Sequence, residues 1–386
     1  MTMLVAPVLW SLPFVLPPIV ALARSARSRS LADVSDVVPS DAPLVSVVVP
    51  ARNEARNIER CVRSLLSSRY PGLEVIVVDD HSEDDTRRIA EAIAPTDARL
   101  RVITAPPLAD GWFGKQWACA AGAREARGEL LLFTDADTRH GPDLLPRAVN
   151  ALRADRVDLL SIAGHQEMHS FWERVVQPQM FALLAMRYGG TEHVSHARRA
   201  VDVIANGQFI LVRRSAYDAV GGHARVRDQV AEDMALAQSF FRDGYRLLLL
   251  LALQQFSTHM YASLGELIAG WRKNIYAGGR NATLGGAMGR AAYPFILLGT
   301  PLLGLFPPVA LVLAALGVLS SAWLVWSAIV VIAAFAFWIP IYRFMGEPIW
   351  YALVYPLGLA MLFYIAAGAV KRGRNVEWKA RKYTAS

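Results

Sequence analysis

The feature that most constrains this chain is where its uncharged apolar stretches lie, which is near its two ends. Met3–Ala23 contains no charged residue and is long enough to cross a hydrocarbon core of about 30 Å. Nearly all of the stretch from Ala291 to Val370 is apolar as well. A chain of 386 residues allows about two or three domains. The sequence therefore predicts a water-soluble middle part held between membrane segments.

The N-terminal stretch is followed directly by Arg24, Arg27 and Arg29, and no basic residue precedes it. A signal peptide has its basic residues in front, so we interpret residues 3–23 as an uncleaved anchor. The four prolines in the stretch weaken it as a helix and leave a signal peptide or a surface-lying segment as alternatives. Basic residues on its downstream side place the next domain in the cytoplasm, which implies a multi-pass protein of the cell (inner) membrane.

The C-terminal apolar part divides into Ala291–Ser321, Ala322–Tyr342 and Ile349–Val370, which predicts at least three membrane segments. The basic tail from Lys371 (KRGRNVEWKARK) should stay in the cytoplasm, yet three crossings after a cytoplasmic domain would leave it outside. The Pro307-Pro308 pair also allows the first segment to form a short hairpin or two tilted passes. We therefore expect about three or four C-terminal transmembrane helices and leave the side of the tail open.

The composition agrees with this division. Hydrophobic residues make up 54% of the chain and charged residues 19%, too apolar for an ordinary soluble enzyme and incompatible with disorder. The net charge is +7, and much of the basic excess flanks the apolar segments, where it meets anionic lipid rather than nucleic acid. Two cysteines, Cys61 and Cys119, exclude a disulfide scaffold and suit a reducing compartment.

The middle part alternates apolar strands with helices. Strands are predicted at Leu44–Val49, Leu73–Val78, Leu100–Thr104 and Leu130–Thr134. Helices are expected between them, including one around Lys115–Arg127. Such alternation predicts an α/β fold with an open, mostly parallel sheet covered by helices.

Acidic residues collect where these strands end. Glu54 follows the first strand, Asp80 the second, and Asp135-Ala136-Asp137 the fourth. Ligands of open parallel sheets bind beyond the carboxyl ends of the strands. The first turn is not G-x-G-x-x-G, so we do not expect a dinucleotide-binding domain. Carboxylates at this edge suit ribose hydroxyls and base N–H groups, but they need a hard cation, Mg²⁺ or Mn²⁺, to bind a diphosphate.

Other candidate residues each allow two interpretations. Lys115, in a glycine-bearing loop before a helix, either meets a phosphate or is a solvated lysine. Glu232 and Asp233 either complement the positive end of a helix or supply a base that deprotonates an acceptor hydroxyl. The Asn206-Gly207-Gln208 segment could be an ordinary turn, and a lone histidine such as His259 is more often structural than a ligand.

Together these segments resemble a membrane-bound family-2 glycosyltransferase with a GT-A fold. VSVVVPARNEARNIERCVRSLL resembles the opening strand and helix of that family, and VIVVDDHSEDDT its nucleotide-binding strand. LLFTDADTRH resembles its metal-binding D-x-D segment, and AEDMALA its catalytic segment. GWFGKQWA, ANGQFILVRRSAYDAVGGH and HMYASLGELIAGWRKN are most similar to enzymes that glycosylate carotenoid acids or hopanoid-type lipids.

The resemblance implies a role for each matching residue. Donor binding would fall to Glu54 and Asp80 (base and ribose), Asp135 (ribose or phosphate), Lys115 and Arg272 (diphosphate). The metal would bind Asp137 and His259, and Asp233 would be the general base, with Glu232 beside it. The acceptor would meet Asn206, Gly207, Gln208 and Trp271. Related enzymes often carry Q-x-x-R-W where this chain has Gly270-Trp271-Arg272-Lys273, so Trp271 and Arg272 depart from the pattern.

The implied reaction is the inverting transfer of a sugar from a nucleotide-sugar, expected to be a UDP-sugar, to a membrane lipid or isoprenoid acceptor. The expected order of segments along the chain is an anchor (3–23), a cytoplasmic GT-A domain (31–260), a membrane-interface segment (261–290), transmembrane segments (291–370) and a basic tail (371–386).

Two alternative functions stay open. A processive polysaccharide synthase would need more spans for a channel, and a transporter or scaffold that only binds nucleotides would be expected to carry intramembrane charge.

Overall fold

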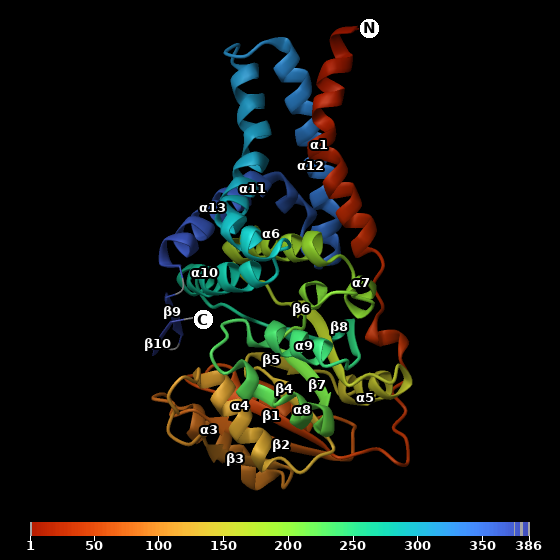
Figure 1. Cartoon of the computed structure of the whole chain (residues 1–386), viewed down its shortest axis with the longest axis vertical. Coiled ribbons are helices and arrows are strands. Elements are labelled where there is room, and N and C mark those ends of the chain that lie inside the picture. Colours follow the sequence, from red (N-terminus) through yellow and green to blue (C-terminus); the bar gives the residue numbers. More distant parts are fainter. Residues whose placement is uncertain (1, 374, 379–380, 385–386) are drawn as a thin grey trace. The chain divides into compact units, whose positions relative to one another are not determined.

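The computed structural model describes residues 2–373, 375–378 and 381–384, which form two compact units (Figure 1). Unit 1 contains the N-terminal residues up to Arg27, together with Met168–His193 and Tyr261–Gly373. Unit 2 contains Ser28–Glu167, Val194–Met260 and a C-terminal hairpin of β9 (Asn375–Trp378) and β10 (Arg381–Thr384). The segment Met168–His193 lies inside the predicted 31–260 domain along the chain but packs within unit 1.

Unit 2 is built around an eight-stranded sheet with the strand order β3-β2-β1-β4-β7-β6-β8-β5. The strands are β1 (Val45–Ala51), β2 (Leu73–Asp79), β3 (Leu100–Thr104), β4 (Leu130–Thr134), β5 (Thr138–His140), β6 (Leu159–Gln166), β7 (Phe209–Arg213) and β8 (Leu247–Thr258). All four predicted strands are present, and β1 to β4 run parallel.

The second half of the sheet makes it mixed. Strand β7 runs antiparallel to both β4 and β6, and β5 runs antiparallel to β8. Because Phe209 pairs with Thr134, the chain enters β7 at the edge where β4 ends. The loop before β7 therefore reaches the same edge as the acidic segment after β4.

Helices cover both faces of this sheet, as expected for an α/β fold. One layer contains α2 (Ile58–Leu66), α3 (Thr86–Ile93) and α5 (Leu144–Ala154), and the other contains α4 (Gly114–Glu125), α8 (Arg214–Val220) and α9 (Glu232–Arg242). Side chains alternate along β1, so Val47 and Val49 are buried against the first layer and Val48 against the second. The short helix α7 spans Thr191–Ser195.

Unit 1 is helical. It contains α1 (Thr2–Ser25), α6 (Phe171–Tyr188), α10 (Leu264–Asn281), α11 (Gly286–Ala315), α12 (Ser321–Phe344) and α13 (Tyr355–Arg372). Four helical stretches among the described residues are long and apolar enough to cross a membrane: Ala6–Ser25, Gly286–Ala315, Ser321–Phe344 and Ile349–Arg372. One is N-terminal and three are C-terminal, in agreement with the prediction.

Helix α11 corrects one alternative. It is a single helix of 30 residues, so the hairpin or pair of tilted passes allowed for Ala291–Ser321 is wrong. Its four internal prolines are tolerated because neighbouring groups and local adjustments can satisfy the backbone of a membrane helix.

Candidate active site

The predicted polar residues of unit 2 gather at the carboxyl ends of β1, β2 and β4 and at the loop that enters β7. Strands β1 and β2 end together because Ala51 pairs with Asp79, and the next residue, Asp80, is almost fully buried. The Arg52 guanidinium fixes this corner by donating to the carbonyl oxygen of Asp80 at 2.7 Å. Nearby, the Asn57 amide donates to a carboxylate oxygen of Glu54 at 3.0 Å.

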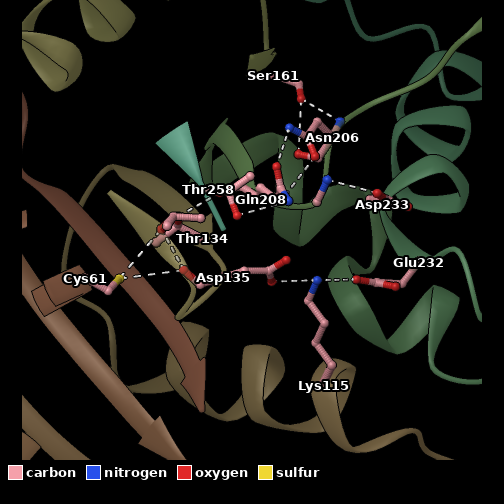
Figure 2. A network of polar contacts seen from close by, with 12 residues as sticks. Cys61, Lys115, Thr134, Asp135, Ser161, Asn206, Gln208, Glu232, Asp233 and Thr258 are labelled. Carbon is pink, nitrogen blue, oxygen red and sulfur yellow. Dashed lines mark hydrogen bonds and ion pairs between the residues drawn. The ribbon is translucent and has the colours of Figure 1, made fainter. Parts of the chain in front are cut away.

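Lys115 joins two of the acidic segments. It stands in the first turn of α4, and its Nζ lies 2.7 Å from Asp135 Oδ1 and 2.7 Å from Glu232 Oε1 (Figure 2). Burial disfavours the charged amine, but these two carboxylates outweigh it and raise the pKa of Lys115 well above its usual value. The lysine is therefore a fixed cation between the end of β4 and the start of α9, rather than a solvated side chain.

Asp137 has the properties of a cation ligand. Its Oδ1 atom is buried and has no hydrogen-bond partner among the residues that the structure describes. Burial, followed by the nearby carboxylates of Asp135 and Glu54, raises the pKa of Asp137 to about 8. His259 lies beside it, because the His259 backbone N–H faces the carbonyl oxygen of Asp137 at 3.4 Å.

Protein ligands alone do not complete a metal site here. Within the described residues, no three His, Cys, Asp or Glu side chains form a metal-binding group. Mg²⁺ commonly binds through one or two carboxylates together with substrate phosphates, so the buried, unpartnered Asp137 oxygen fits such an ion.

Asp233 is held from two sides in the first turn of α9. Its Oδ2 accepts the backbone N–H of Gly207 at 2.9 Å, and its Oδ1 accepts the N–H of Met234 at 2.7 Å. Burial, and then the carboxylate of Glu232, raise the pKa of Asp233 to about 6. A carboxylate with that pKa is largely ionised at neutral pH and can still accept a proton efficiently.

The neighbouring residues of the loop point into the protein. Asn206 donates to the carbonyl oxygen of Ile162 at 2.9 Å and to the side chain of Gln208 at 3.2 Å. Gln208 is buried, and its amide donates to Thr258 Oγ1 at 3.4 Å (Figure 2). In the structure, Asn206 and Gln208 thus support the loop, while the Gly207 backbone contacts the proposed base.

A buried hydroxyl network, which sequence reasoning missed, lies behind the acidic segment. Thr134 donates to the carbonyl oxygen of Gln208 at 2.7 Å, and Thr138 donates to that of Asp135 at 2.7 Å. His140 Nε2 lies 3.1 Å from the Thr134 hydroxyl and 3.0 Å from the Thr138 hydroxyl. Burial lowers the pKa of His140 to about 3, so this histidine stays neutral.

Two predicted residues, Trp271 and Arg272, belong to α10 in unit 1. The Trp271 ring centroid lies 5.8 Å from that of Phe181, and the Arg272 guanidinium lies 4.7 Å from the ring centroid of Tyr364. The Trp271 indole nitrogen and Arg272 Nε are both buried without a hydrogen-bond partner in the described part of the chain. Their proposed roles toward acceptor and diphosphate remain predictions.

Comparison with known proteins agrees with this geometry. Residues 46–221 match the model of the family described as Glycosyl transferase family 2. The chain is 27% identical over 237 residues to a 4,4'-diaponeurosporenoate glycosyltransferase of Staphylococcus haemolyticus (strain JCSC1435), which covers 61% of each chain. It is 26% identical over 239 residues to the protein of the same name from Staphylococcus aureus (strain bovine RF122 / ET3-1), again 61% of each. The match therefore spans about three-fifths of these relatives.

A solved structure shares the fold over nearly the whole length. The mannosyltransferase PcManGT from Pyrobaculum calidifontis, in complex with GDP-Man and Mn²⁺, superposes with a TM-score of 0.59. The identity is 20%, and the match covers 96% of this chain and 98% of that chain. The predicted GT-A-type sheet with flanking apolar helices is confirmed. Residues 46–221 of this chain are thus similar to a glycosyl transferase family 2 domain.

Proposed function

We propose that this protein transfers one sugar, with inversion at the anomeric carbon, from a nucleotide-sugar to a lipid-like or isoprenoid acceptor at a membrane. The observation that carries the proposal is the position of Asp233: a half-buried carboxylate with a raised pKa, next to the Lys115 cation that joins Asp135 to Glu232. A base and a fixed cation at one sheet edge are what a displacement with an anionic leaving group requires.

The proposed donor is a UDP-sugar. Asp80 and Glu54 would contact its base and ribose, and Asp135 its ribose or phosphate. The carboxyl-end position of these residues supports the assignment, because ligands bind at that edge of such sheets. The mannosyltransferase with the similar fold is in complex with GDP-Man. The transfer assay therefore compares UDP-sugars with GDP-sugars as donors.

The proposed mechanism is a single displacement. Asp233 accepts the proton of an acceptor hydroxyl, and the acceptor oxygen forms its bond to the anomeric carbon. The bond to the diphosphate oxygen breaks on the opposite face, and its electron pair leaves with the nucleoside diphosphate. Attack from one face inverts the configuration. The Lys115 cation, which already lies between two carboxylates, would meet the negative charge that develops on the diphosphate.

Asp137, with His259 beside it, would hold a divalent ion, Mg²⁺ or Mn²⁺. Such an ion stabilises negative charge on phosphate oxygens when it is bound. The buried Asp137 oxygen without a partner among the described residues supports this assignment. The Mn²⁺ in the fold neighbour supports it further.

The lipid-like acceptor is proposed from two observations. The relatives above are named for glycosylating 4,4'-diaponeurosporenoate, a lipid-like carotenoid acid. Four helices of this chain are long and apolar enough to cross a membrane, which would place the site where an amphiphile can reach it.

Trp271 is a proposed acceptor contact and Arg272 a proposed diphosphate contact. The basic residues after α1 support a cytoplasmic catalytic domain in the cell membrane.

The test uses the full-length protein in lipid nanodiscs with a nucleotide-sugar, a divalent ion and lipid extract. Release of nucleoside diphosphate and a lipid heavier by one sugar are expected, with both lost on chelation or in Asp137→Ala. The matched control is Asp218→Asn, an exposed carboxylate on α8. A ladder of longer products would instead indicate a polysaccharide synthase, and nucleotide binding without turnover a non-catalytic protein.

A further inference from the structure

The basic residues around the apolar helices distinguish three membrane crossings from four. They lie in the last turn of α1 (Arg24) and just after it (Arg27), near the start of α11 (Arg290) and at the ends of α12 (Arg343) and α13 (Lys371, Arg372). The link at 316–320 between α11 and α12, by contrast, has no charged residue, and neither does α1 before Arg24. If α1, α11 and α12 cross the membrane and α13 does not, all of these basic residues lie on the same side of the membrane. A fourth crossing would move the whole basic tail to the other side.

The middle of α13 packs against a charged side chain. The guanidinium of Arg272, on α10, lies 4.7 Å from the ring centroid of Tyr364. One turn further along α13, a Cβ atom added to Gly368 would collide with the same guanidinium. A charged side chain at the centre of a bilayer is strongly disfavoured. The part of α13 around Tyr364 is therefore better placed at the polar boundary than at the hydrocarbon centre.

The start of α13 packs against another helix that carries ionisable groups. A Cβ atom on Gly358 would lie 2.5 Å from Gln179 Nε2 and 2.8 Å from the carbonyl oxygen of Val175, both on α6. Helix α6 also carries Arg174, which pairs with Glu347 in the link between α12 and α13 at 2.6 Å. Ten residues of helix rise about 15 Å, so α13 stays beside polar or charged helices for at least half the thickness of a hydrocarbon core.

The arrangement of unit 1 agrees with these contacts. In Figure 1, α1 and α11 run alongside α12, whereas α13 turns away from α12 and packs against α11, α10 and α6. The outward face of α13 is apolar: Leu357 and Ala360, three residues apart, are both exposed. A helix with one face packed on polar helices and an apolar outer face suits the boundary of a lipid leaflet.

We infer that α13 lies along the membrane boundary with α6 and α10 and does not cross the bilayer. The chain then crosses three times, through α1, α11 and α12. The basic tail emerges on the side to which the chain passes after α1, where it meets the anionic headgroups of that leaflet. This arrangement removes the conflict between the charge of the tail and the number of apolar segments.

The test places single cysteines in the full-length protein and labels them with a membrane-impermeant maleimide in sealed vesicles of known orientation. Both native cysteines are buried, so the unmodified chain gives the background. Ser320→Cys reports the link between α11 and α12. Glu83→Cys, whose native side chain is 77% exposed, reports unit 2, and Ser386→Cys reports the tail. Labelling after detergent treatment gives the total for each variant.

The expected result is that Ser386→Cys and Glu83→Cys are labelled in the same vesicle orientation, and Ser320→Cys only in the opposite one. Labelling of Ser386→Cys together with Ser320→Cys would overturn the inference, because the chain would then cross four times. Protease removal of a C-terminal tag, scored in the same vesicles, gives the same decision if the tail cysteine reacts slowly. Neither measurement depends on glycosyl transfer, so failure here leaves the proposed function standing.

Discussion

The backbone N–H of Gly207 donates to Asp233 Oδ2 across 2.9 Å and ties the loop before β7 to the first turn of α9. A Cβ atom at position 207 would lie only 3.0 Å from that oxygen, closer than ordinary van der Waals contact. The position of the proposed base therefore depends on the absence of a side chain in the loop.

Gly207→Ala is expected to lower kcat by about 10- to 100-fold, because displacing a catalytic group by a few tenths of an ångström to 1 Å has effects of this order. The KM for the nucleotide-sugar should change little, since the hydrogen bonds described for the loop's side chains and for the Gly207 N–H go to Ile162, Asp233 and Thr258 rather than to the proposed donor residues. Steady-state kinetics over both substrates makes the comparison. Gly265→Ala is the control, because the nearest atom to its added Cβ is 3.8 Å away. An unchanged kcat in Gly207→Ala would refute the positioning role.

The pH dependence of kcat/KM should report the base. Because the pKa of Asp233 is about 6, activity is expected to fall as pH drops through that value and the carboxylate becomes protonated. The carboxylate of Glu232 contributes to this raised pKa, after burial. Glu232→Gln removes a negative charge and so lowers the pKa of Asp233. The fall in activity at acidic pH, the acid limb of the pH profile, should therefore move to lower pH. An acid limb that moves to higher pH would contradict this electrostatic account.

Lys115→Met should have the opposite effect on the same limb. The Lys115 cation lowers the pKa of Asp233, so its loss should move the acid limb to higher pH. The KM for the nucleotide-sugar should also rise, by about tenfold or more, since a charged hydrogen bond contributes about 1.5–3 kcal/mol. Lys115→Arg keeps the charge and should recover much of the loss. Equal defects in both variants would mean that shape, rather than charge, is what matters.

Thr134→Val tests the hydroxyl network behind the acidic segment. The fully buried Thr134 hydroxyl donates to the carbonyl oxygen of Gln208, and valine has the same shape without the donor. Leaving that carbonyl unsatisfied is expected to lower the free energy of unfolding by about 1–3 kcal/mol, seen as a lower Tm. Thr134→Ser keeps the hydroxyl donor and should lower the free energy of unfolding by less. The acid limb should stay in place, because the hydrogen bonds described for Thr134 and Thr138 go to Gln208, Asp135 and His140 rather than to the Asp233 carboxylate.

Much of the fold could be predicted from local patterns. The apolar runs that became β1 to β4 were found because buried parallel strands are continuously apolar, and β1, β2 and β4 are followed by the acidic residues that mark the site. The antiparallel direction of β7 could not be predicted from such patterns, because direction depends on where the chain enters the sheet. The assignment of Met168–His193 to unit 1 was missed for a similar reason: its packing partners are distant in sequence.

The residues of the site could be predicted from their types, but the contacts between them could not. Asp135, Glu232 and Lys115 were each singled out, yet nothing in the sequence shows that one amine bridges both carboxylates. His140 lies three residues after Asp137, and the hydroxyls around it come from residues that are common in turns and strands. The threonines on either side of the acidic segment were the available signal, because short hydroxyl side chains often fix such loops.

The role of Asp233 as the base is tested most directly by comparing wild-type protein with Asp233→Asn in one transfer assay. Each is reconstituted in nanodiscs with a nucleotide-sugar, Mn²⁺ and lipid extract, and lipid products are followed by mass spectrometry. We expect a lipid heavier by one sugar from the wild-type protein and a rate about 10²- to 10⁴-fold lower from Asp233→Asn, with nucleotide binding retained. Equal rates of transfer by the two proteins would contradict this role.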